Sequence, residues 1–134
     1  MILELFWGLM AALPIFFLVP LFQKYFSIKL LAATILVAIA FIYVGFALKE
    51  NSVSDIIIEV IAALGFYFIA VIGYTRKPQL IAFGILLHGL WDLTHHLISG
   101  LNANPDYWPI FCLTIDVIWS IYFYFIFKNQ KGNV

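Results

Sequence analysis

Long apolar stretches alternate with short polar connections along the whole chain. Each stretch has about 20 residues and very few charges. A helix rises 1.5 Å per residue and the hydrocarbon core of a bilayer is about 30 Å thick, so about 20 apolar residues cross it. The pattern therefore predicts five transmembrane helices, at Ile2–Phe22, Leu30–Leu48, Ile56–Tyr74, Leu80–Ser99 and Trp108–Phe127.

Proline and turn-forming residues mark where these helices bend or end. Pro14 and Pro20 stand inside the first span and are expected to bend or interrupt it, because proline has no amide hydrogen to donate. Asn104, Pro105 and Asp106 form the clearest turn, between the fourth and fifth spans. The expected fold is all-α: residues 1–134 form a single polytopic membrane domain.

The composition supports a membrane protein and excludes other classes. The chain has 134 residues, of which 65% are hydrophobic and 10% charged, whereas soluble domains have about 45–50% apolar and 25% charged residues. Its formal net charge of zero gives no electrostatic reason to expect nucleic-acid binding. Cys112 is the only cysteine, which excludes an internal disulfide and a multi-thiolate metal site.

The basic residues predict the orientation of the five spans. Six of the seven lysines and arginines fall on one side of the membrane, and only Lys49 falls on the other. Cytoplasmic loops carry an excess of lysine and arginine. We therefore expect an extracytoplasmic N-terminus and a cytoplasmic C-terminus, in a multi-pass protein of the cytoplasmic (inner) membrane.

The fourth predicted span contains a dense polar segment with all three histidines of the chain. At about 100° per residue, one face of this helix carries Gly84, His88, Trp91, Asp92, His95 and Ser99, with His96 at its edge. Leucines occupy the opposite face. Ionised groups are costly in hydrocarbon, so they usually pair with one another and mark function.

The fifth predicted span offers a partner for this polar face. Asp116 lies about 12 Å below the Trp108 end of its helix, at 1.5 Å per residue. His88 and Asp92 lie roughly 16 and 10 Å below Ser99 by the same rise. Because the two spans form a helical hairpin, we expect the three side chains to meet at one level.

Two further acidic residues and a tyrosine fall in the same half of the predicted bundle. Glu4 lies early in the first span, Glu59 one turn into the third, and Tyr43 near the end of the second. The other half is almost purely apolar. Simple solvation at the membrane interface is an equal alternative for Glu4 and Glu59.

Histidines and aspartates at helical spacing suit a divalent metal. We expect His88, Asp92, His95 and Asp116 to hold the ion, with zinc the leading choice, and His96 or Glu59 to act as the catalytic acid or base. The corresponding function is a metal-dependent membrane hydrolase. Its partners would be membrane lipid and a lipid-like small molecule that enters from the extracytoplasmic leaflet.

Three alternatives remain open at this point. A metal-free isomerase could move protons through a carboxylate and a histidine, with Trp91 facing a cationic intermediate. The same residues could belong to a proton- or cation-handling protein. They could also form a hydrogen-bonded seam that fixes the register of the helices. Whether the protein forms a homo-oligomer is open as well.

The polar string of the fourth span reads His88-x-x-Trp91-Asp92-x-x-His95-His96, and Trp108, Pro109 and Asp116 follow it. This string resembles small uncharacterised bacterial integral membrane proteins, a resemblance that covers the last two spans and implies no activity. Alkaline ceramidases are similar in using histidine and aspartate across membrane helices to hold zinc, but they have seven spans and a His-x3-His pair. The sterol-isomerase group is similar in size and in lining a membrane cavity with acids, histidine and tryptophan.

Overall fold

All elements of the described chain are α-helices. The computed structural model describes residues 2–50, 52–98 and 105–130, and among them all side chains except those of 50, 95–98 and 130. No strand occurs within these ranges. The helices are α1 (Ile2–Ala12), α2 (Ile15–Phe22), α3 (Ile28–Glu50), α4 (Val53–Thr75), α5 (Gln79–Ile98) and α6 (Trp108–Gln130).

The first predicted span is divided into α1 and α2, as its prolines lead one to expect. The helix is interrupted at Leu13 and Pro14, and the amide of Phe16 donates to the Leu13 carbonyl at 3.1 Å instead of reaching back one residue further. The carbonyl of Ala12 is thereby left for another donor. Trp119 Nε1 donates to it at 3.1 Å, which ties the interruption to α6.

Four helical segments of the described chain are long and apolar enough to cross a membrane. They are Ile2–Phe22, Ile28–Lys49, Val53–Thr75 and Trp108–Asn129. Within α5 the apolar stretch is shorter, Gln79–Thr94. The all-helical fold expected from the sequence is therefore confirmed, with four segments suited to a membrane.

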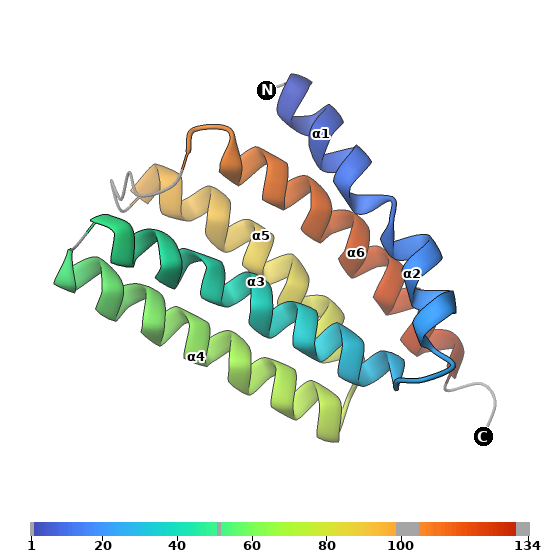
Figure 1. The fold of residues 1–134 in the computed structure, drawn as a ribbon. Helices are drawn as coiled ribbons and strands as arrows, with labels where there is room; N and C mark the ends of the chain where they lie inside the picture. The colour runs from blue at the N-terminus through green and yellow to red at the C-terminus, as the bar shows by residue number, and fades with distance from the viewer. Residues whose placement is uncertain (1, 51, 99–104, 131–134) are drawn as a thin grey trace.

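The helices form two packed hairpins with an additional segment at one edge. α5 packs along α6, and α3 along α4, while α5 also contacts both α3 and α4. α1 packs against α6 and lies at the edge of the bundle, on the side remote from α4 (Figure 1). α5 is consequently the central helix of the bundle.

Buried side chains divide the bundle into two halves of different chemistry. We call the half near the α4–α5 connection the apolar half. Its buried side chains include Val19, Leu36, Ile81, Ile85, Phe123 and Phe127. We call the half near the α3–α4 connection the polar half. It buries Tyr43, Glu59, His88, Asp92 and Asp116.

Candidate functional site

α5 places two titratable side chains on its buried face in the polar half. His88 and Asp92 are four residues apart, so one helical turn brings both to the same side. Their exposed fractions are 2% and 0%. Both side chains are thus enclosed by the neighbouring helices.

Gly89 allows α6 to approach this part of α5 closely. A Cβ atom at Gly89 would lie 3.0 Å from the Cβ of Asp116 and 3.1 Å from a side-chain carbon of Leu113. A larger residue at this position would therefore push α6 away. The missing side chain lets the backbone of α6 bring Asp116, which is 2% exposed, to the His88 ring.

The imidazole of His88 lies between two carboxylates. Its Nδ1 is 2.8 Å from Oδ2 of Asp116, and its Nε2 is 3.7 Å from Oδ1 of Asp92. When Asp116 is ionised, its carboxylate can only accept a hydrogen bond, and Nδ1 of His88 then carries the proton and donates it to Asp116. In the neutral ring the lone pair is then on Nε2, which faces Asp92.

The atoms on the Asp92 side of the ring have no hydrogen bond of standard geometry from the described residues, although the Tyr43 hydroxyl and the Cys112 thiol lie within interaction distance of the Asp92 carboxylate. The atoms without such a bond are Nε2 of His88 and both carboxylate oxygens of Asp92. One ligand atom from each of His88, Asp92 and Asp116 lies within 4.8 Å of the other two. The three side chains could therefore hold one metal ion.

Three other helix positions surround the cluster. The ring centroids of Tyr43 on α3 and Phe66 on α4 are 6.3 and 5.3 Å from that of His88, both with edge-on geometry. Tyr43 and Cys112 lie beside the carboxylate of Asp92. Four helices, α3 to α6, thus contribute side chains to this site.

The structure brings together three of the predicted site residues, His88, Asp92 and Asp116. The contact of Asp116 with His88, expected from the depths of their helices, is present at 2.8 Å, although a role in metal binding is still a prediction. Glu59 is buried on α4 and is an electrostatic neighbour of Tyr43. Glu4 instead lines a groove between α1 and α6 with Trp7 and Phe111, among others.

Two predicted residues cannot be placed in the site. The backbone of His95 and His96 belongs to α5, but their side chains lie outside the described part of the chain. Their predicted roles, as a metal ligand and as an acid or base, stay predictions.

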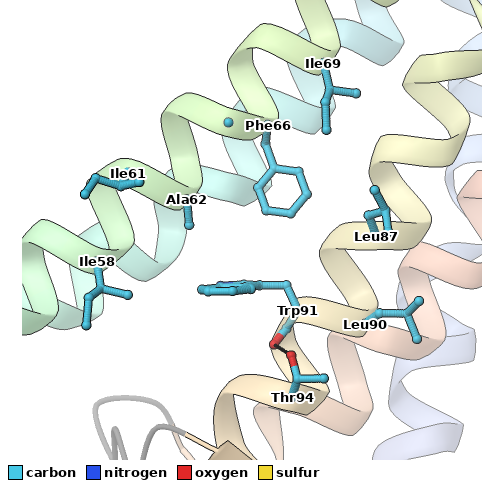
Figure 2. A pocket seen from close by; sticks show the side chains of 10 residues that line it. Ile58, Ile61, Ala62, Phe66, Ile69, Leu87, Leu90, Trp91 and Thr94 are labelled. Carbon is cyan, nitrogen blue, oxygen red and sulfur yellow. Dashed lines mark hydrogen bonds between the residues drawn. The ribbon is translucent and has the colours of Figure 1, made fainter.

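The helical pattern predicts that Trp91 shares the buried face of His88 and Asp92, but in the structure Trp91 is only partly buried. It lies at the α4–α5 interface, where it lines a groove with Phe66 and Leu87, among others (Figure 2). Trp91 lies about 100° from Asp92 around the helix, at the edge of the polar face, and the packing of α4 against α5 determines which way that edge faces. The role of Trp91 toward a cationic intermediate stays a prediction.

Sequence reasoning missed two residues that shape the site. Gly89 sets the distance between α5 and α6, and Phe66 closes the site toward α4. A glycine directly after a buried histidine was a usable signal for close helix packing. Phe66 gave no such signal, because a phenylalanine in an apolar helix is typical of any membrane span.

Comparison with known proteins places the chain in a family. No curated protein and no solved structure matches it. A family model described as a family of unknown function, DUF6010, matches residues 3–129, nearly the whole chain. This agrees with the resemblance of the last two spans to uncharacterised membrane proteins. The chain therefore belongs to the DUF6010 family of unknown function.

Proposed function

We propose that this protein is a metal-dependent enzyme of the cytoplasmic membrane, which hydrolyses a lipid-like substrate that enters from the extracytoplasmic leaflet. The observation that carries the proposal is the pair formed by His88 Nε2 and the Asp92 carboxylate. Both are buried, and neither has a hydrogen bond of standard geometry within the described residues, although the Tyr43 hydroxyl and the Cys112 thiol lie within interaction distance of the carboxylate. A buried unsatisfied polar group costs about 1–3 kcal/mol, and more when it is charged. A bound cation would satisfy both groups at once.

The distances in the cluster fit a metal ion. Two ligand atoms bound to a tetrahedral zinc at about 2.0–2.2 Å are roughly 3.4 Å apart, and Nε2 of His88 is 3.7 Å from Oδ1 of Asp92. Asp116 accepts from the opposite ring nitrogen, the arrangement in which a carboxylate fixes the tautomer of a metal-binding histidine. His88 and Asp92 would hold the ion, with His95 as a third ligand. Asp116 would position His88 or supply a further oxygen.

The proposed setting is a five-span protein with an extracytoplasmic N-terminus and a cytoplasmic C-terminus. α5 has 20 residues, which correspond to about 30 Å of helix, enough to cross a hydrocarbon core. The six-to-one division of basic residues supports the orientation. It puts the polar half in the extracytoplasmic leaflet, where the substrate would enter sideways between helices.

The side chains around the cluster would support a hydrolytic reaction in several ways. A divalent ion at this position supplies a Lewis acid that polarises a carbonyl or phosphoryl oxygen. Tyr43 and Phe66 enclose the site and keep bulk water away, which strengthens electrostatic interactions within it. Glu59 and His96 are the proposed acid and base.

A metal-free isomerase is the second candidate, and the 2.8 Å contact of His88 with Asp116 favours it. A carboxylate that accepts from Nδ1 orients the ring and stabilises its protonated form. Nε2 would then act as a general base, and the adjacent Asp92 as its partner in proton transfer. The two candidates use the same residues and differ in whether a metal is required.

Metal analysis of the purified, detergent-solubilised protein separates them. We expect about one divalent transition ion per chain, and loss of that ion in His88→Ala and Asp92→Asn. Ser120→Ala is the matched control, because Ser120 is a buried polar residue of α6 outside the ligand group. Bound metal should also fall as the pH drops through the range in which histidine is protonated, because the ligand is neutral imidazole. A wild-type protein that is metal-free after gentle purification, and that does not bind added zinc, would overturn the metal proposal in favour of the isomerase.

A further inference from the structure

A groove runs along the α4–α5 interface beside the His88 cluster. Its volume is about 630 Å³, within the range of about 300–1,000 Å³ that is usual for small-molecule sites. Phe66 from α4 and Trp91 from α5 point into it from facing helices (Figure 2). The full lining consists of Ile58, Ile61, Ala62, Gly65, Phe66, Ile69, Leu87, Leu90, Trp91 and Thr94.

The polarity of the lining determines what can occupy the groove. Eight of its ten residues have purely apolar side chains, and the other two are Trp91, with its indole nitrogen, and Thr94. The Thr94 hydroxyl already donates a hydrogen bond to the Trp91 carbonyl at 3.0 Å. Ile61 and Leu90 are exposed, so the groove opens sideways, toward the hydrocarbon of the bilayer. A charged head group would be costly here, whereas a hydrocarbon chain matches the surface.

The length of the groove matches one leaflet. Ile58 and Ile69 mark its extent along α4, eleven residues apart, which is about 16 Å at 1.5 Å per residue. Half of a hydrocarbon core of about 30 Å is about 15 Å. An extended chain that follows the helices would therefore lie within the leaflet that contains the polar half.

Phe66 connects the groove to the cluster. The same ring lines the groove and lies edge-on to His88, with 5.3 Å between centroids. A chain next to Ile69 and Leu87 would place the polar end of its lipid toward Trp91 and Thr94. These residues lie on the turns of α5 that carry His88 and Asp92.

From this continuity we infer that the α4–α5 groove binds one acyl chain of a bilayer phospholipid, with Phe66 as the wall between that chain and His88. This inference rests on the proposed function, because it identifies the lipid-like substrate of that function as an acyl lipid. Its test does not depend on a bound metal.

Gly65 provides a way to fill the groove without disturbing the packing of the helices. It lines the groove, and a Cβ atom there would meet nothing within 4 Å. Gly45 on α3 also has open space around a Cβ atom but does not line the groove. Gly65→Leu and Gly45→Leu are therefore a matched pair.

The experiment uses full-length protein in maltoside detergent micelles, to which a phosphatidylcholine with a diazirine on one acyl chain is added in increasing amounts. After illumination, mass spectrometry maps the labelled segments. We expect labelling of 58–69 and 87–94 that saturates with probe, whereas labelling of the exposed face of α1 rises in proportion to it. Gly65→Leu should lower groove labelling about tenfold or more, because an overfilled site loses binding energy. Gly45→Leu should leave it unchanged.

Groove labelling that does not saturate, or that is equal in Gly65→Leu and wild type, would overturn the inference and show ordinary lipid contact. The His88→Ala variant distinguishes this result from failure of the proposed function. Saturable labelling should persist in that variant even though its metal is lost. A wild-type protein that binds no metal but shows saturable labelling would overturn the metal proposal and support the acyl-chain site.

Discussion

The polar and apolar halves are built from the same helices, yet they are held together by different interactions. In the apolar half, Phe123 and Phe127 stack with 5.9 Å between centroids, and large apolar side chains fill the interior. Small residues let helices approach closely in both halves, Gly84 in the apolar half and Gly89 in the polar half. The polar half differs because its contact between α5 and α6 includes the His88–Asp116 hydrogen bond. The comparison indicates that the apolar half provides stability, while the polar half gives up some stability to keep titratable groups together.

The largest expected effect is on folding, in the apolar half. Phe123 is fully buried, so Phe123→Ala should lower the free energy of unfolding by about 3–5 kcal/mol through loss of packing and formation of a cavity. Thermal unfolding in detergent measures this change. Phe125→Ala is the control, because Phe125 lies on the same helix and is exposed. Equal losses in the two variants would contradict the assignment of stability to the buried apolar side chains.

A smaller effect, on metal affinity, is expected from Asp116→Asn in the polar half. If Asp116 orients His88 without binding the ion, its loss should weaken zinc affinity about 10–100-fold, the usual cost of removing such a partner. Zinc should still bind at saturating concentration, whereas Asp92→Asn should abolish binding. Zinc titration of both variants with a competing chelator measures the difference. Equally severe losses would show that Asp116 is a ligand, as its sequence pattern predicted.

The smallest expected effect is that of one methyl group at the α5–α6 contact. Gly89→Ala places a Cβ atom 3.0 Å from that of Asp116, and the resulting overpacking should cost about 1 kcal/mol, at the low end for such changes. Gly45→Ala has open space and should be neutral or stabilising by about 0.5–1 kcal/mol, because alanine favours helix. Thermal unfolding of the two variants measures the change in stability, and zinc titration measures whether the site is disturbed. If Gly89→Ala leaves both unchanged, close packing at this position does not hold the site together.

The depth of a residue along its helix could be predicted from the sequence, but the neighbouring helix that the side chain of Trp91 faces could not. The rise per residue is fixed by backbone hydrogen bonding, so counting from the last connection placed Asp116 level with His88, and the contact is present. The same fixed chemistry explains why Pro14 divides the first segment. The facing of Trp91 depends on how α4 and α5 pack, which single-helix periodicity does not determine.

The boundaries of the site depend on residues whose role appears only in three dimensions. Gly89 matters because Asp116 of another helix lies against it, and Phe66 matters because its ring lies edge-on to that of His88. The starts of helices were less predictable than their interiors: α3 begins at Ile28, two residues before the expected Leu30. Short polar segments next to a membrane can continue a helix without changing the apolar pattern.

The identity of the atoms around the metal tests the central claim most directly. X-ray absorption at the zinc edge of the purified, zinc-loaded protein should show nitrogen and oxygen ligands at about 2.0–2.2 Å, with the outer-shell scattering of imidazole. His88→Ala should lose that imidazole signal. A sulfur ligand at about 2.3 Å would place Cys112, which lies beside Asp92, in the coordination sphere. That result, or a spectrum that His88→Ala leaves unchanged, would contradict a centre built on His88 and Asp92.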